Sequence, residues 1–111
     1  MSKKPPANFY PAIYAQMLPT IRDIARECGW GIGLHGSLIK DLDLIAIPWI
    51  DDATSARDMV ERISDNIGGK VGYGSGFAPG HRTGFSITFD YNAHGKVTEG
   101  YIDFSIADPR K

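Results

Sequence analysis

Apolar side chains recur at helical spacing near the start of the chain. Within residues 10–28 the apolar positions follow one another at intervals of three or four: Ile13, Met17, Ile21, Ile24 and Cys28. This spacing places them on one face of an α-helix. Pro19 lies inside the segment and is expected to kink the helix or split it in two, and Gly29 is its natural stop. The pattern predicts a helix that forms one wall of the core.

A second helical face lies in the middle of the chain. Its apolar positions are Met59, Val60, Ile63 and Ile67. Ser55 precedes Asp58 by three residues, which resembles a capping box with Asp in place of the usual Glu. The pair Gly68-Gly69 ends the pattern. We therefore predict a second amphipathic helix here.

Continuous or alternating apolar runs, typical of strands, make up most of the remaining chain. They occupy residues 30–34, 41–48, 70–73, 85–91 and 97–106. A glycine-rich loop at 74–84 and a hairpin-type turn at 92–95 separate the later runs. The order is helix, two strands, helix, then two or three strands. It predicts an α+β domain in which a mixed sheet of about four to five strands carries both helices on one face.

Length, charge and cysteine content narrow the classes of function. The 111 residues leave room for one domain, which we expect at 9–107, with tails at 1–8 and 108–111. The formal net charge of −1 disfavours a general nucleic-acid coat, because that function needs a basic surface. The single cysteine excludes an internal disulfide framework and fits a reducing cytoplasm. No run approaches the ~20 apolar residues of a membrane-spanning helix, so we expect no membrane partner.

Three carboxylates interrupt the apolar strand patterns. Asp41 and Asp43 are two residues apart, so on a strand they share a face and lie ~6.6 Å apart at ~3.3 Å per residue. Asp103 stands between Ile102 and Phe104 in the last strand. Carboxylates placed there repel one another and lose hydration, and a divalent cation relieves both penalties. The acids therefore predict a Mg²⁺ or Mn²⁺ site, or two metals ~3.5–4 Å apart if the strands are neighbours; the alternative is that the pair consists of turn acids at a strand start.

Small and basic residues near these acids are candidates for holding phosphate. Gly36-Ser37 is a tight turn whose N–H groups and hydroxyl can hold an anion. Lys40 is a possible counter-charge, and Arg82 in the glycine-rich loop could pair with phosphate if that loop closes over the acidic face. A solvated loop is the alternative for Arg82. For Trp49, strand-end packing is the first interpretation and base stacking the second.

The run Leu34-His35-Gly36-Ser37, then Asp41-Leu42-Asp43-Leu44 and later Ile102-Asp103-Phe104, resembles the DNA polymerase beta-like nucleotidyltransferase superfamily. The resemblance covers roughly residues 10–106 and is closest to minimal, single-domain members, which are found in toxin–antitoxin modules and mobile elements. It implies that Gly36 and Ser37 hold the triphosphate of an NTP such as ATP, and that the three aspartates bind Mg²⁺. It also implies that Asp103 deprotonates or orients an acceptor hydroxyl, on a protein, a nucleic acid or a small molecule.

The chain departs from that family at one place. Only Leu38-Ile39-Lys40 separates Gly-Ser from Asp-x-Asp, where most members have a longer segment with a short helix whose N-terminus helps to bind phosphate. A second hypothesis follows: a catalytically silent domain that binds a nucleotide or a partner protein in a regulatory, antitoxin-like role. An exposed edge strand also favours a homodimer or a heteromer.

Overall fold

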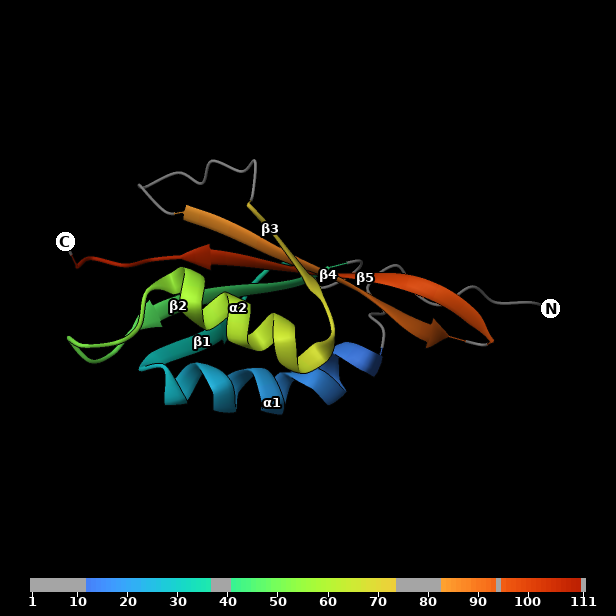
Figure 1. Ribbon diagram of the computed structural model, residues 1–111, viewed down its shortest axis with the longest axis horizontal. Coiled ribbons are helices and arrows are strands. Elements are labelled where there is room, and N and C mark those ends of the chain that lie inside the picture. Colours follow the sequence, from blue (N-terminus) through green and yellow to red (C-terminus); the bar gives the residue numbers. More distant parts are fainter. Residues whose placement is uncertain (1–11, 37–40, 74–82, 94, 111) are drawn as a thin grey trace.

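The computed structural model describes residues 12–36, 41–73, 83–93 and 95–110, which form two helices and a five-stranded sheet (Figure 1). In chain order the elements are α1 (Ala12–Glu27), β1 (Trp30–Leu34), β2 (Leu42–Pro48), α2 (Ala56–Ile67), β3 (Lys70–Tyr73), β4 (Thr83–Ala93) and β5 (Lys96–Ile106). The strands lie in the order β1-β2-β5-β4-β3. Only the β2–β5 pair is parallel. The predicted α+β fold with a mixed sheet and two packed helices is confirmed.

Both helices form where the apolar spacing predicts them. α1 is one helix rather than two, although Pro19 lies within it. Pro19 and Ala15, whose carbonyl loses its usual donor, are both exposed, so water can take the place of the missing hydrogen bond. At the start of α2 the Ser55 hydroxyl accepts a hydrogen bond from the Asp58 amide at 3.1 Å, and Gly68 at φ +71° ends the helix.

Neither helix of the described chain has the length and apolar character needed to cross a membrane.

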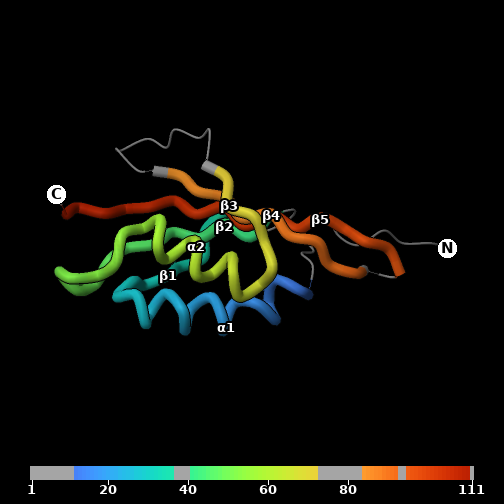
Figure 2. Tube along the Cα trace, viewed as in Figure 1, coloured from blue at the N-terminus to red at the C-terminus, as the bar shows by residue number. Residues whose placement is uncertain are grey.

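The core lies between the helices and one face of the sheet (Figure 2). Every second residue of the three central strands is buried there: Leu42, Leu44, Ala46, Phe85, Ile87, Phe89, Ile102, Phe104 and Ile106. From the helices Ile21, Ile24, Met59 and Ile63 pack against them. Each such aliphatic side chain contributes ~1.5–3 kcal/mol on full burial. The residues between them in sequence therefore point to the opposite face, which neither helix covers.

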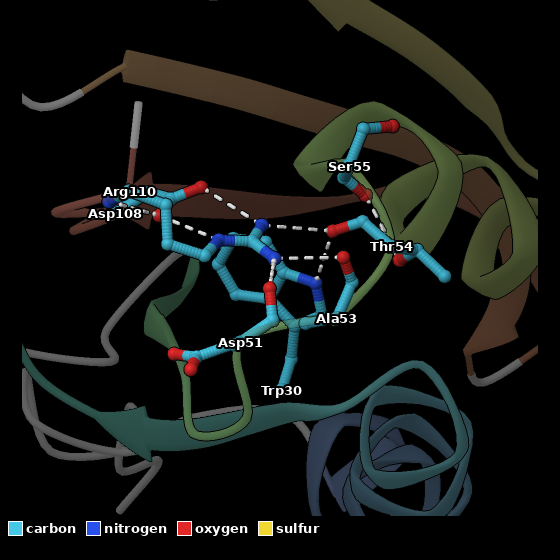
Figure 3. A network of polar contacts seen from close by, with 7 residues as sticks. All are labelled: Trp30, Asp51, Ala53, Thr54, Ser55, Asp108 and Arg110. Atoms are coloured by element: carbon cyan, nitrogen blue, oxygen red, sulfur yellow. Dashed lines mark hydrogen bonds and ion pairs between the residues drawn. The ribbon is translucent and has the colours of Figure 1, made fainter.

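The segment after β5 is attached to the loop before α2 through Arg110 (Figure 3). Its guanidinium donates to the backbone carbonyls of Asp51, Ala53 and Thr54 at 2.7–3.1 Å and forms an ion pair with Asp108 at 3.0 Å. The same guanidinium lies 5.5 Å from the ring centroid of buried Trp30. Residues 108–110, expected as a tail, thus contact the start of β1 and the loop that leads to α2; the expected tail at 1–8 lies outside the described residues.

Candidate functional site

Two of the three candidate acids are neighbours on the helix-free face. In the parallel β2–β5 pair, Asp43 is in register with Asp103, and paired strands lie ~4.8 Å apart. Both acids alternate with buried residues of their strands, so their side chains share the face opposite the helices. Asp41 is the residue immediately before β2 and is half-buried. The structure therefore brings together on one sheet two acids that are 60 positions apart in the sequence.

The backbone after β1 lies directly against Asp43. The His35 amide donates to the Asp43 carbonyl at 3.0 Å, which extends the β1–β2 pairing by one residue. Gly36 follows with φ +80°, a conformation that favours glycine. A Cβ added to Gly36 would overlap the carboxylate of Asp43. Gly36 is thus small for a specific reason: its backbone occupies the space beside this carboxylate.

The electrostatics of the acids are those of a repulsive, partly desolvated pair. Burial raises the pKa of Asp43, and the charges of Asp103 and Asp41 raise it further. Burial also raises the pKa of Asp103, with Asp41 adding to the shift. His35 acts on both carboxyls in the opposite direction and lowers their pKa values. The group thus carries unfavourable negative charge that a cation would relieve.

A tyrosine from α1 supports the strand that carries Asp103. The hydroxyl of Tyr14, a residue that is 1% exposed, accepts a hydrogen bond from the Tyr101 amide at 3.2 Å. Tyr101 lies one residue before the first paired residue of β5 on the β2 side, so the Tyr14 hydroxyl supplies the acceptor that β2 does not provide there. Burial raises the pKa of the Tyr14 hydroxyl, and the charges of Asp41 and Asp43 contribute to that shift. Tyr14 is therefore close to the acids as well as to the core.

Small residues continue the face beyond the acids. Ser86 of β4 is in register with Asp103, and Gly72 of β3 is in register with Ser86. Two residues further along β2, Ile45 is in register with Gly33 of β1 on one side and with Ser105 of β5 on the other. Neither helix covers this face; on it Asp103 is exposed, Asp43 is half-buried and Ser86 is buried.

The remaining predicted site residues are not all placed. Ser37, Lys40 and Arg82 lie outside the described residues. Trp49, predicted to pack at a strand end, is 65% exposed, whereas Trp30 is buried in the core. His35, the residue before Gly36 in the His-Gly-Ser run, is exposed, and its charge lowers the pKa values of Asp43 and Asp103.

The acids suit a cation that needs few protein ligands. Within the described residues, no three His, Cys, Asp or Glu side chains form a ready-made metal cluster. Mg²⁺ is commonly held by one or two carboxylates, with water and substrate phosphate completing its shell. The Asp43–Asp103 pair offers two such carboxylates, and burial and neighbouring acids raise the pKa of each.

No family model matches the chain, and no curated protein sequence matches it.

Proposed function

We propose that the chain is a small Mg²⁺-dependent nucleotidyltransferase that moves an NMP from an NTP to an acceptor hydroxyl. The observation that carries the proposal is the register pairing of Asp43 with Asp103 on the sheet face that neither helix covers, with Gly36 against Asp43. The parallel strands give two carboxylates a common direction, and the His35-Gly36 turn lies at the same end of the sheet. This arrangement agrees with the resemblance to the DNA polymerase beta-like nucleotidyltransferases.

In the proposed reaction the acceptor oxygen forms a bond to the α-phosphorus. The bond from that phosphorus to the bridging oxygen breaks, and pyrophosphate leaves with the bonding electron pair. Asp103 orients the acceptor hydroxyl and takes its proton, which then passes to solvent. Gly36 allows the triphosphate to approach the backbone, and Ser37, Lys40 and Arg82 are proposed to contact its phosphates.

Asp41, Asp43 and Asp103 are the residues that would hold Mg²⁺ or Mn²⁺. When bound, the cation would neutralise charge that develops on the phosphates and on the leaving pyrophosphate. The three carboxylates would keep it on the helix-free face, beside the Gly36 turn.

A transfer assay tests the proposal. The purified chain is incubated with Mg²⁺, a cell extract and each α-³²P-labelled NTP in turn, and label on a macromolecule or metabolite is measured. Asp43→Asn and Asp103→Asn should each lower transfer by roughly 100-fold or more, because charge stabilisation at the reacting phosphate is lost. Asp90→Asn is the matched control, because Asp90 is an exposed acid opposite Glu99 in the β4–β5 pair. Absence of any thermal shift with Mg²⁺ and NTP together would contradict the proposal.

A second candidate is a silent member of the same fold that binds a nucleotide or a partner protein. The observation that favours it is the lack of a three-ligand metal cluster within the described residues. The short segment 38–40 between Gly36-Ser37 and Asp41 also favours this second candidate. For such a regulatory, antitoxin-like module, the double variant Asp41→Asn with Asp43→Asn should retain full biological effect, whereas a transferase should lose it.

The proposed setting is the cytoplasm. The only cysteine, Cys28, is a buried free thiol, as a reducing compartment allows. The proposed partners are an NTP, an acceptor that is a protein or a nucleic acid, and a second copy or another protein in a homodimer or heteromer.

A further inference from the structure

β1 forms one edge of the sheet, and half of its backbone groups point away from the sheet. The hydrogen bonds from the His35 amide to Asp43 and from the Trp49 amide to Gly29 fix the phase of the β1–β2 pairing. In an antiparallel pair the hydrogen-bonded residues alternate. Gly31 and Gly33 therefore face β2, and Trp30, Ile32 and Leu34 present their amides and carbonyls outward. Within the described chain no strand lies on that side.

A charged hollow lies beside this edge. It has a volume of 220 Å³ and is lined by Arg22, Arg26, Trp30, Gly31, Ile32 and Trp49. The two arginines lie one turn apart on α1 and are exposed, and neither forms an ion pair with a described residue. The volume is below the ~300–1,000 Å³ of small-molecule sites, so it suits one or two side chains.

Apolar side chains are exposed along the same edge. Trp49 is 65% exposed, Leu34 51% and Ile47 48%. Ile47 stands opposite Gly31 in the register, and because glycine has no side chain, Ile47 can be reached from the edge. Exposed apolar groups gathered in this way are typical of a surface that binds another protein.

We propose that β1 binds an extended, acidic segment of a partner protein as a sixth strand of the sheet. The segment's backbone would pair with the outward amides and carbonyls of Ile32 and Leu34. Its acidic side chains, at alternate positions, would reach Arg22 and Arg26. The positions between them would place apolar side chains against Ile47. This site is separate from the acidic pair and does not depend on the proposed catalytic function.

The observations favour a peptide over other occupants. The edge alternates donors and acceptors, which a peptide backbone matches; nucleic-acid phosphates offer acceptors only. A second copy of the chain, paired β1 to β1, would bring its own α1 to the same place. Arg22 and Arg26 would then face two further arginines, and like charges at close range oppose that arrangement.

The probe is a fluorescein-labelled seven-residue peptide of alternating Glu and Val, measured by fluorescence polarisation against the full chain. We expect binding that weakens with salt and falls at least roughly tenfold in the Arg22→Gln, Arg26→Gln double variant. The matched control is Arg62→Gln, because Arg62 is an exposed arginine on α2; it should bind like the parent. A peptide N-methylated at every residue has no amide N–H left to donate to an edge strand, so it should bind at least tenfold more weakly.

Several results would overturn the proposal. They are equal binding of a Lys-Val peptide, equal binding of the N-methylated peptide, and no binding of the Glu-Val peptide at millimolar concentration. Binding of a single-stranded oligonucleotide that depends on Arg22 and Arg26, with no peptide binding, would assign the site to nucleic acid instead. A dimer in sedimentation that the Glu-Val peptide fails to dissociate would assign the edge to a second copy.

Discussion

Among single residues, Gly36 determines how closely the chain approaches the acidic pair. Its φ of +80° costs an alanine ~1–2 kcal/mol, and the added Cβ would overlap the Asp43 carboxylate. We therefore expect Gly36→Ala to lower the free energy of unfolding by about that amount and to displace the carboxylate. Urea denaturation checks the first effect, and loss of the Mg²⁺–NTP thermal shift checks the second. Unchanged stability would show that this turn can relax away from Asp43. Gly95→Ala is the control for the backbone strain alone, because Gly95 also has φ +80° but no atom lies within 4 Å of a Cβ added there.

The acidic pair should destabilise the metal-free protein at neutral pH. Burial and neighbouring charges raise the pKa of Asp43 and of Asp103 in the folded chain, so the folded state binds protons more readily than the unfolded state. Stability is therefore lost as the pH rises from the ordinary pKa of 3.8 through the raised values. We expect Asp103→Asn to stabilise the chain at pH 7 by about 0.2–1 kcal/mol, the size of a cross-strand charge pair.

The stabilisation by Asp103→Asn should shrink as the pH falls towards 4, because the carboxylates of the parent then become neutral. Thermal denaturation of the parent and the variant in EDTA at several pH values measures this stabilisation. Asp23→Asn, at an exposed position on α1, is the control. A pH-independent gain, or a loss at pH 7, would contradict the assigned electrostatics.

At the scale of elements, a partly buried hydrogen bond joins α1 to β5. Tyr14→Phe leaves the Tyr101 amide without this acceptor, and an amide that loses its partner away from water costs ~1–3 kcal/mol. We expect that loss of stability, together with faster hydrogen exchange at the Tyr101 amide. Tyr91→Phe is the control, because the ring of Tyr91 is half-buried beside Phe89. Equal effects of the two changes would mean that the Tyr14 bond does not support the strand.

The loop between β2 and α2 depends on Arg110. Its planar guanidinium contacts three carbonyls and Asp108 at once, a geometry that the single ammonium of lysine cannot reproduce. Arg110→Lys should therefore lower the melting temperature nearly as much as Arg110→Ala. Arg57→Lys, in an exposed ion pair with Glu61, should change it little.

The Arg110 contact should also weaken in acid. Hydrogen bonding to Arg110 lowers the pKa of Asp108 in the folded chain. Its contribution is present above the ordinary carboxyl pKa and is lost as the pH falls through the lowered value. The difference in melting temperature between the parent and Arg110→Ala should narrow in that pH range. A difference that stays constant would mean that the loss of stability in Arg110→Ala comes from the carbonyl contacts alone.

For the whole molecule, periodicity was sufficient to predict the two helices and the strands, because each buries one face against the same core. It could not predict that β2 pairs with β5 in parallel, since that pairing depends on contacts between distant residues. Asp43 and Asp103 were recognised as acids in apolar strands, but their register required the folded chain. Arg110 gave no periodic signal, because its partners are backbone carbonyls.

The central claim is that Asp43 and Asp103 together bind a divalent cation with a nucleotide. The most direct test is ¹H–¹⁵N NMR of the full chain with Mn²⁺ and a non-hydrolysable ATP analogue, because Mn²⁺ broadens nearby amides. We predict that the amides of Gly36, Asp43, Asp103 and Ser86 broaden first, and that the Asp43→Asn, Asp103→Asn double variant loses this effect. Broadening centred on Asp90 and Glu99, or broadening that persists in the double variant, would contradict it.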